Sequence, residues 1–234
     1  MTTYILVHGS FHGGWCWDKV VPHLESLGAR AIAIDLPGHG AQRIPASQAS
    51  LAGYVDHVCQ VVAEQPTPVV LVGHSMAGMV VSGVAERLPE AIRKLVFVCA
   101  FLPQNGQALV DLARTDNESL LMPALVFDEP NGVHFVRDEG AREAFYHDCP
   151  EDLASAARAR LIPEPLSVVT TPVSLSERFA KVPRDYIHCT EDHALGPSLQ
   201  RRMLEAQPCR VHSIPSSHSP FYSMPERLAQ LLVA

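Results

Sequence analysis

The sequence predicts an α/β protein whose core is a doubly wound, mostly parallel sheet of six strands. Two observations lead to this prediction. Short runs that are too uniformly apolar for strands with one wet face recur along the chain, and stretches of helical spacing separate them. Within the first hundred residues the alternation gives four strands and three intervening helices, a pattern typical of parallel sheets covered by helices on both faces.

The elements of this core can be placed in order. The strands are expected at residues 4–7, 31–35, 68–72, 95–99, 185–189 and 210–214, and the helices at 17–27, 50–64, 76–88, 197–206 and 225–233. Gly28 and Pro66 end the first two helices, and Ser50 is placed to cap the start of the second one.

Residues 103–183 break this rhythm. The segment lacks buried-strand runs and contains eight of the nineteen prolines. Short helical patterns are expected at 107–114, 139–147 and 151–161, and the runs 124–127 and 133–136 flank a turn-forming stretch and predict a hairpin. Because this segment has few long apolar faces, it would make a poor independent core. We therefore expect residues 1–102 and 184–234 to form the core and residues 103–183 to form an inserted cap subdomain.

Composition limits the partners that the chain can have. With 234 residues and a net charge of −7, the sequence has no cationic patch of the kind that nucleic acid or an anionic membrane surface selects. Its N-terminus shows no secretory pattern, so a cytoplasmic location is expected. The six cysteines are scattered without C-x-x-C spacing, and the sequence indicates no metal site and no cofactor. A homodimer remains open.

The segment from Gly73 to Gly78, with the sequence GHSMAG, is the first candidate for chemistry. It follows a buried strand and opens a helix, so Ser75 must sit on a sharp, strained turn that admits only small residues two positions before and after it. Gly73 and Ala77 meet that demand. An ordinary strand-to-helix turn with a serine N-cap fits the same letters, and the rest of the chain has to decide between the two interpretations.

Two further residues fit a nucleophilic serine. Asp192 and His218 follow Ser75 in the order acid then base, and each lies just beyond the carboxyl end of a predicted strand. The three side chains are therefore expected to meet at one edge of the sheet, where His218 would take the serine proton and the carboxylate would orient the imidazole. Glu191, next in sequence to Asp192, is an alternative acid.

A glycine-rich loop follows the first strand, at residues 8–15. Three glycines within six positions let the backbone come close to a ligand, so this loop is the natural place for binding an oxyanion. We expect the backbone N–H of Ser10 and that of Met76, the residue after the nucleophile, to stabilise a tetrahedral intermediate. His8 and His12 are expected to brace this loop, and Asp35 and His39 to brace the loop that follows the second strand, rather than to take part in chemistry.

Over nearly its whole length the sequence resembles the α/β-hydrolases of the hydroxynitrile lyase and plant methylesterase group, which includes salicylic acid-binding methyl esterases. The resemblance is carried by the segments 8–15 (HGSFHGGW), 73–78 (GHSMAG), 99–103 (CAFLP), 149–154 (CPEDLA), 189–192 (CTED) and the loop around His218. It implies the α/β-hydrolase fold and a triad of Ser75, Asp192 and His218. It also implies that Phe101 belongs to a substrate pocket under the cap.

The group contains esterases and cyanohydrin-cleaving lyases, which differ at two positions. The (S)-selective lyases that resemble this chain carry a lysine directly after the catalytic histidine, and lyases of the group carry Thr or Asn after the first-strand histidine; here these positions are Ser219 and Gly9. Ser219 has no ammonium group to stabilise departing cyanide, which speaks against a lyase. Gly9 matches the esterases and is expected to leave room for an ester carbonyl.

The prediction is therefore a serine carboxylesterase that acts through an acyl-serine intermediate on a small to medium apolar or aromatic ester. Gly9, Phe101 and Ser219 are the expected substrate-binding residues. Two alternatives remain: a hydroxynitrile lyase, and a protein of the same fold that binds a ligand and turns it over slowly.

Overall fold

Six parallel strands form the central sheet in the order β2-β1-β3-β4-β8-β9. The computed structural model describes residues 1–42 and 44–234; Arg43, within the range expected to form the core, lies outside the described residues. The strands are β1 (Thr3–Val7), β2 (Arg30–Ile34), β3 (Val69–His74), β4 (Ile92–Val98), β8 (Arg184–Cys189) and β9 (Arg210–Ile214). The predicted doubly wound sheet is thus confirmed, with every expected strand within a few residues of its predicted bounds.

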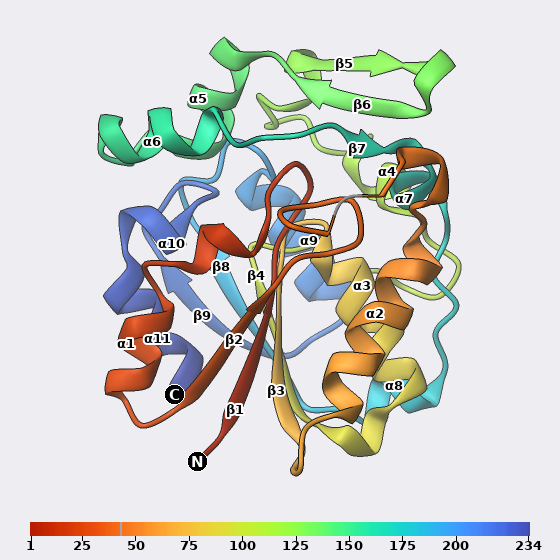
Figure 1. The fold of residues 1–234 in the computed structure, drawn as a ribbon, viewed down its shortest axis with the longest axis vertical. Coiled ribbons are helices and arrows are strands. Elements are labelled where there is room, and N and C mark those ends of the chain that lie inside the picture. Colours follow the sequence, from red (N-terminus) through yellow and green to blue (C-terminus); the bar gives the residue numbers. More distant parts are fainter. Residues whose placement is uncertain (43) are drawn as a thin grey trace.

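Helices cover both faces of the sheet (Figure 1). On one face α2 (Leu51–Ala63), α3 (Ala77–Arg87), α8 (Glu177–Lys181) and α9 (Pro197–Ala206) contribute to one hydrophobic core; on the other, α1 (Val21–Ser26), α10 (Pro220–Ser223) and α11 (Pro225–Val233) contribute to a second. Every residue of β1 and β3 is buried, as expected for strands enclosed on both sides. No helix within the described ranges combines the length and apolarity needed to cross a bilayer.

The helix expected at residues 17–27 is shorter than predicted. Its first part is a 3₁₀ turn, η1 (Gly14–Trp17), and α1 begins only at Val21. Pro22 lies in the first turn of α1, where its missing N–H costs no hydrogen bond. The apolar spacing that predicted one helix from Trp17 therefore belongs to two short elements in sequence.

The segment between β4 and β8 lies mainly over the carboxyl ends of the strands (Figure 1). It contains α4 (Leu109–Ala113), α5 (Asp138–Tyr146), α6 (Glu151–Arg158), α7 (Leu166–Thr170) and an antiparallel sheet of β5 (Leu125–Asp128), β6 (Val133–Val136) and β7 (Glu164–Pro165). The segment also contains the 3₁₀ turns η4 (Met122–Ala124) and η5 (Glu129–Asn131). Two further 3₁₀ turns, η2 (Ala46–Gln48) and η3 (Pro89–Ala91), lie before β4. The segment's last helix, α8, lies instead beside α3 on the flank of the core (Figure 1).

The two-residue strand β7 is the element of this segment that matters most for the site. It extends the predicted hairpin by pairing His134 with Glu164 and Val133 with Pro165. A strand of two residues that includes a proline carries no periodic signal, so the sequence did not predict it. Its consequence is that a carboxylate from the segment over the sheet is carried into the molecule's interior.

Gly78, at the start of α3, allows the helix to pack directly on the backbone of Phe101. A Cβ built on Gly78 would lie 1.9 Å from the Phe101 carbonyl oxygen. Gly78→Ala should therefore force the helix and this backbone apart and lower the free energy of unfolding by about 3 kcal/mol or more. Urea denaturation followed by circular dichroism measures the change.

The matched control is Gly53→Ala in α2, where the nearest atom to a new Cβ is the Ser50 hydroxyl at 3.3 Å. There the better helix propensity of alanine should keep the change within about 1 kcal/mol. Equal stabilities of the two variants would contradict the proposed role of the contact between α3 and Phe101.

Candidate active site

The chain turns sharply at Ser75, between the end of β3 and the start of α3. Ser75 has φ = +54°, a left-handed conformation that residues other than glycine rarely adopt. Its N–H donates to the Val98 carbonyl (3.3 Å), and its own carbonyl accepts from the N–H of Phe101 (3.1 Å). A Cβ on Gly73 would lie 2.9 Å from the Ala77 carbonyl oxygen, so the strand cannot enter this turn with a larger residue there.

His218 and Asp192 form a buried pair on the neighbouring loops. His218 Nδ1 donates to Asp192 Oδ2 at 2.7 Å, and both side chains are at most 2 % exposed. The other carboxylate oxygen, Oδ1, accepts from the backbone N–H groups of Ala194 and Leu195, each at 2.8 Å. These donors fix the carboxylate, which in turn fixes the face and tautomer of the imidazole.

Gln200 on α9 completes the shell around the acid, and the sequence analysis did not identify it. Its Nε2 lies 3.2 Å from Asp192 Oδ2 and 2.7 Å from the Leu195 carbonyl. Glu191, the alternative acid, is exposed, and its backbone carbonyl rather than its carboxylate is engaged, by His147 Nε2 at 2.8 Å. The structure thus brings Asp192, and not Glu191, to the imidazole.

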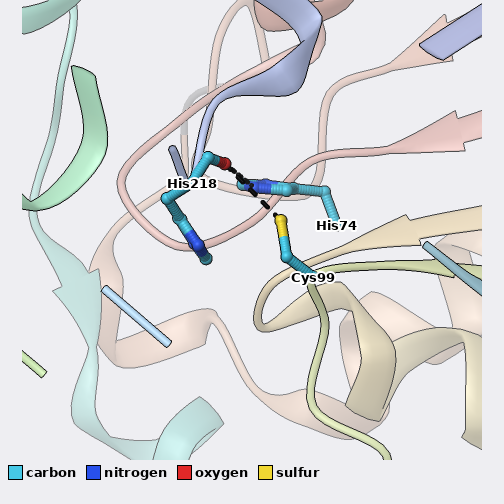
Figure 2. Close-up of side chains that lie close together, drawn as sticks. All are labelled: His74, Cys99 and His218. Atoms are coloured by element: carbon cyan, nitrogen blue, oxygen red, sulfur yellow. Dashed lines mark hydrogen bonds between the residues drawn. The ribbon is translucent and has the colours of Figure 1, made fainter. Parts of the chain in front are cut away.

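The backbone of His218 is held as firmly as its side chain. Figure 2 shows His74 and Cys99 converging on the His218 carbonyl: His74 Nε2 donates to it at 2.8 Å, and the Cys99 thiol does so at 3.6 Å. Burial holds the pKa of His74 well below its usual range, so this ring is neutral. One potential metal-ligating atom from each of His74, Cys99 and His218 lies within 4.8 Å of the others. Because the His74 N–H and the Cys99 thiol both donate to the His218 carbonyl, this cluster supports the backbone of His218.

The glycine-rich loop lies directly against the turn at Ser75. A Cβ on Gly9 would lie 2.7 Å from Ser75 Cβ and 2.9 Å from His74 Nδ1. Within residues 1–42 and 44–234, the backbone N–H groups of Ser10 and Met76 have no hydrogen-bond acceptor, although both residues line the same cavity as Ser75. Two unsatisfied donors beside one hydroxyl are what an oxyanion site requires.

Histidines brace this loop, as the sequence predicts. His8 Nδ1 donates to the Gly9 carbonyl at 2.8 Å, and its Nε2 accepts from the Leu36 N–H at 3.0 Å. His12 Nδ1 donates to the Ser10 carbonyl at 2.8 Å, and its Nε2 accepts from the Tyr146 hydroxyl at 2.6 Å. Burial lowers the pKa of His8 well below its usual range and that of His12 to about 4, so both rings bind backbone as neutral groups.

The loop after the second strand is braced in the same way. Asp35 accepts from the backbone N–H groups of Gly14 (2.7 Å) and Ala41 (2.9 Å). His39 Nδ1 donates to the carbonyl of His12 at 2.7 Å. Both side chains therefore have the structural role that the sequence analysis expected, and the two loops are tied together.

A cavity of about 610 Å³, part of it open to solvent, lies over Ser75. Its walls combine residues of the core with residues of the segment between β4 and β8, most of them apolar: Ser10, Phe11, His12, His74, Ser75, Met76, Phe101, Leu109, Ala113, Asp116, Ser119, Leu121, Met122, Leu125, His134, Phe145, Val169, Ala194, Leu195 and His218. The candidate triad members Ser75 and His218 thus open on one space.

Of the three expected substrate-binding residues, Phe101 lines this cavity, whereas Gly9 and Ser219 are not among its walls. Gly9 packs closely against the turn, since a Cβ on it would lie 2.7 Å from Ser75 Cβ and 2.9 Å from His74 Nδ1. Ser219 is fully buried, and its hydroxyl has no hydrogen-bond partner among the described residues. Both differences arise from packing in three dimensions.

Most aromatic residues of the segment between β4 and β8 lie away from the cavity wall. Phe145 lines the cavity. Phe127 and Phe135 are 55 % and 38 % exposed on the hairpin, while Tyr146 and Phe179 are core residues. Alternation along a short hairpin does not say which face meets the cavity, since that depends on how the hairpin is docked.

A parallel sheet with a strained serine at the turn after a central strand is typical of the α/β-hydrolase architecture, and here the imidazole of a buried imidazole–carboxylate pair lines the same cavity as that serine. The comparison with protein families agrees: a model described as the alpha/beta hydrolase family matches residues 4–231. The chain belongs to the alpha/beta hydrolase family.

Within this family the chain is similar to proteins that are named as esterases or hydrolases. The chain is 30% identical over 245 residues to putative methylesterase 12, chloroplastic, of Arabidopsis thaliana, covering 98% of this chain and 70% of that protein. It is 31% identical over 242 residues to a pyrethroid hydrolase of Sphingobium wenxiniae, covering 99% and 86%. A crystal structure of a pyrethroid hydrolase superposes with a TM-score of 0.90 at 30% identity, covering 99% of this chain and 96% of that one.

These relatives confirm the predicted resemblance to the methylesterase group and the predicted class of enzyme, an ester hydrolase. The comparisons confirm the class of ester hydrolases, and the substrates named for these relatives are theirs alone.

Gly9→Ala tests the close approach of the loop to the serine turn. Because no Cβ fits at Gly9, the substitution should displace Ser10 or Ser75 and lower kcat/KM for ester hydrolysis by about a hundredfold. Steady-state kinetics with a p-nitrophenyl ester measures the effect, with Gly53→Ala as the control. A Gly9→Ala enzyme that keeps wild-type kinetics would show that the packing at this point does not determine the geometry of the site.

Proposed function

We propose that this protein is a serine carboxylesterase in which Ser75 is the nucleophile, His218 the base and Asp192 the acid of a catalytic triad. The observation that carries the proposal is the buried His218–Asp192 hydrogen bond of 2.7 Å, with His218 opening on the same cavity as Ser75. The relatives named as esterases and hydrolases support the reaction class.

In the proposed first step, His218 takes the Ser75 proton as Oγ attacks the ester carbonyl carbon. Asp192 balances the imidazolium that forms, and the N–H groups of Ser10 and Met76 stabilise the negative charge on the former carbonyl oxygen. Collapse of the tetrahedral intermediate breaks the bond to the alcohol, which leaves with the proton from His218. The acyl group remains on Ser75.

In the second step water replaces the alcohol. His218 removes a proton from the water, the resulting hydroxide attacks the acyl carbon, and the same two N–H groups stabilise the second tetrahedral intermediate. The carboxylic acid then leaves, and the proton returns to Ser75. His8, His12 and His74 are neutral and engaged with backbone or tyrosine, whereas His218 is paired with the Asp192 carboxylate, so His218 is the histidine proposed to carry this proton.

The proposed substrate is an uncharged ester with an apolar or aromatic acyl or alcohol group. Side chains such as Leu109, Leu121, Met122 and Phe145 supply an apolar wall. Asp116, the one carboxylate among the described residues of that wall, accepts from the N–H groups of Gly196 (2.7 Å) and Glu118 (3.0 Å) and so is already engaged.

The same wall favours ester hydrolysis over cyanohydrin cleavage. Lysine and arginine are absent from the described residues that line the cavity, so a departing cyanide would meet no cation. The position after His218, which is a lysine in the lyases that the sequence resembles, is the fully buried Ser219.

Ser75→Ala should abolish hydrolysis while leaving the fold intact. Loss of the nucleophile is expected to lower kcat by about 10⁴-fold or more. The measurement is hydrolysis of a panel that runs from short p-nitrophenyl esters to methyl esters of aromatic acids and esters of bulky alcohols, with a charged ester as the negative probe. Ser82→Ala, a buried serine within α3, is the matched control.

A fluorophosphonate probe separates the two parts of this proposal. It should label the wild-type protein at Ser75 and leave Ser75→Ala unlabelled. Labelling at Ser75 without turnover of any ester would favour the slow ligand-binding alternative, and cyanide release from mandelonitrile that exceeds every ester rate would favour the lyase.

Asp192→Asn should lower kcat by about 10⁴-fold, because an amide in place of the carboxylate favours the wrong tautomer of His218. Glu191→Gln changes the same functional group one residue away, on an exposed side chain, and should leave kcat within about twofold of wild type. Steady-state kinetics on both variants decides the assignment, and the reverse ranking would transfer the acid role to Glu191.

A further inference from the structure

A buried carboxylate reaches from the segment over the sheet into the core, outside the proposed triad. Glu164 lies on β7 and is fully buried. Its Oε1 accepts from the Tyr54 hydroxyl at 3.0 Å, and its Oε2 accepts from the backbone N–H of Phe11 at 3.3 Å. His39 Nε2 lies 3.4 Å from Oε2. These three partners all belong to the core, so the carboxylate joins two parts of the fold.

Charge keeps this carboxylate ionised despite its burial. Desolvation alone would raise the pKa of Glu164, but His39 and the hydrogen bonds outweigh it and lower that pKa. The same pairing raises the pKa of His39. A buried charge is costly unless it is paired and hydrogen-bonded, so a carboxylate at this place needs the partners that it has.

Phe11 is the partner that connects Glu164 to the chemistry. Phe11 has φ = +68°, a strained conformation for a residue with a side chain. Both of its backbone polar groups are held by the segment over the sheet: the N–H by Glu164 and the carbonyl by the N–H of Ile162, at 3.0 Å. The strained residue is therefore held from both sides, and it directly follows Ser10.

We infer that Glu164 is a positioning residue for ester hydrolysis, which acts by holding Phe11 in its left-handed conformation so that the preceding N–H, that of Ser10, points into the cavity over Ser75. The inference rests on the proposed function, in which the Ser10 N–H stabilises the oxyanion. It adds that the segment between β4 and β8, besides enclosing the substrate, sets the geometry of the oxyanion site.

The chemistry distinguishes an acceptor role from a charge role. In Glu164→Gln, the amide oxygen can still accept from the Phe11 N–H, while the amide nitrogen donates to the Tyr54 oxygen and Tyr54 donates to neutral His39. In Glu164→Ala the acceptor is lost. If the role is to hold Phe11, glutamine should restore function; if the charge itself acts on the reaction, glutamine should fail as alanine does.

The experiment compares kinetics for wild type, Glu164→Ala and Glu164→Gln. Alanine should lower kcat by about tenfold or more with KM within about twofold, because a displaced oxyanion donor weakens binding of the transition state and not of the ester. Glutamine should recover kcat to within about threefold of wild type. The control is Asp185→Asn on β8, which removes a buried carboxylate that pairs with Lys94 of β4 at 2.8 Å; it should change stability without changing kcat.

A second readout does not need activity. In protein labelled with ¹⁵N-phenylalanine, the Phe11 amide should exchange with deuterium about tenfold faster or more in the alanine variant and at about the wild-type rate in the glutamine variant. If the wild type hydrolyses no ester, the proposed function fails, and this exchange still decides whether Glu164 holds Phe11.

Three outcomes would overturn the inference. They are wild-type kcat in Glu164→Ala, unchanged exchange of the Phe11 amide in that variant, and a rise in KM with kcat unchanged, which would make Glu164 a residue of the substrate pocket. Should Glu164→Ala fail to fold, Glu164→Asp withdraws the carboxylate by one methylene and should show the same fall in kcat and the same faster exchange.

Discussion

The turn at Ser75 requires backbone segments to come closer together than any side chain would permit. Ser75 has φ = +54°, and three glycines surround this turn: Gly9, Gly73 and Gly78. A Cβ added to these glycines would lie 2.7 Å, 2.9 Å and 1.9 Å, respectively, from the nearest atom. Each glycine removes one clash, so the strand before the serine, the helix after it and the loop beside it all meet there. The rest of the site is built around this crowded point.

Around that turn three buried histidines bind neighbouring polar groups as neutral rings. Burial lowers the pKa values of His8, His12 and His74. Their ring nitrogens form hydrogen bonds with backbone carbonyls, with a backbone N–H or with a tyrosine hydroxyl. Neutral imidazoles can make such bonds without the cost of burying a cation. Charge is concentrated where it is paired, as between His39 and Glu164.

The segment between β4 and β8 contributes to the site in two ways. It supplies much of the apolar wall of the cavity, and through Ile162 and Glu164 it binds the backbone of Phe11. An enzyme built like this can change its substrate by changing the wall while its core keeps the reacting groups, as loops on a rigid scaffold generally permit. The binding of Phe11 limits that freedom, because residues 162–164 face the loop that carries Ser10.

The sequence by itself determined the sheet, the order of strands and helices, the serine turn and the ester hydrolase class. The sheet, the order of elements along the chain and the serine turn follow from local signals, namely uniformly apolar runs, helical spacing, and small residues around Ser75 at a strand-to-helix junction. The ester hydrolase class followed from the resemblance to the methylesterase group. The two acid candidates, Glu191 and Asp192, were left undecided by spacing alone, since adjacent residues on a loop share the same position relative to the strand. Resemblance to a family favoured Asp192.

Only the tertiary structure decided which side chains meet. It turned Asp192 inward to His218 and Glu191 outward, and it placed Phe101 but neither Gly9 nor Ser219 in the cavity wall. It also formed β7, whose Glu164 lies 153 residues from Phe11 in the chain and yet binds it. Such contacts depend on how distant segments pack, and neither propensity nor periodicity within a segment carries that information, because both describe a residue only relative to its own neighbours along the chain.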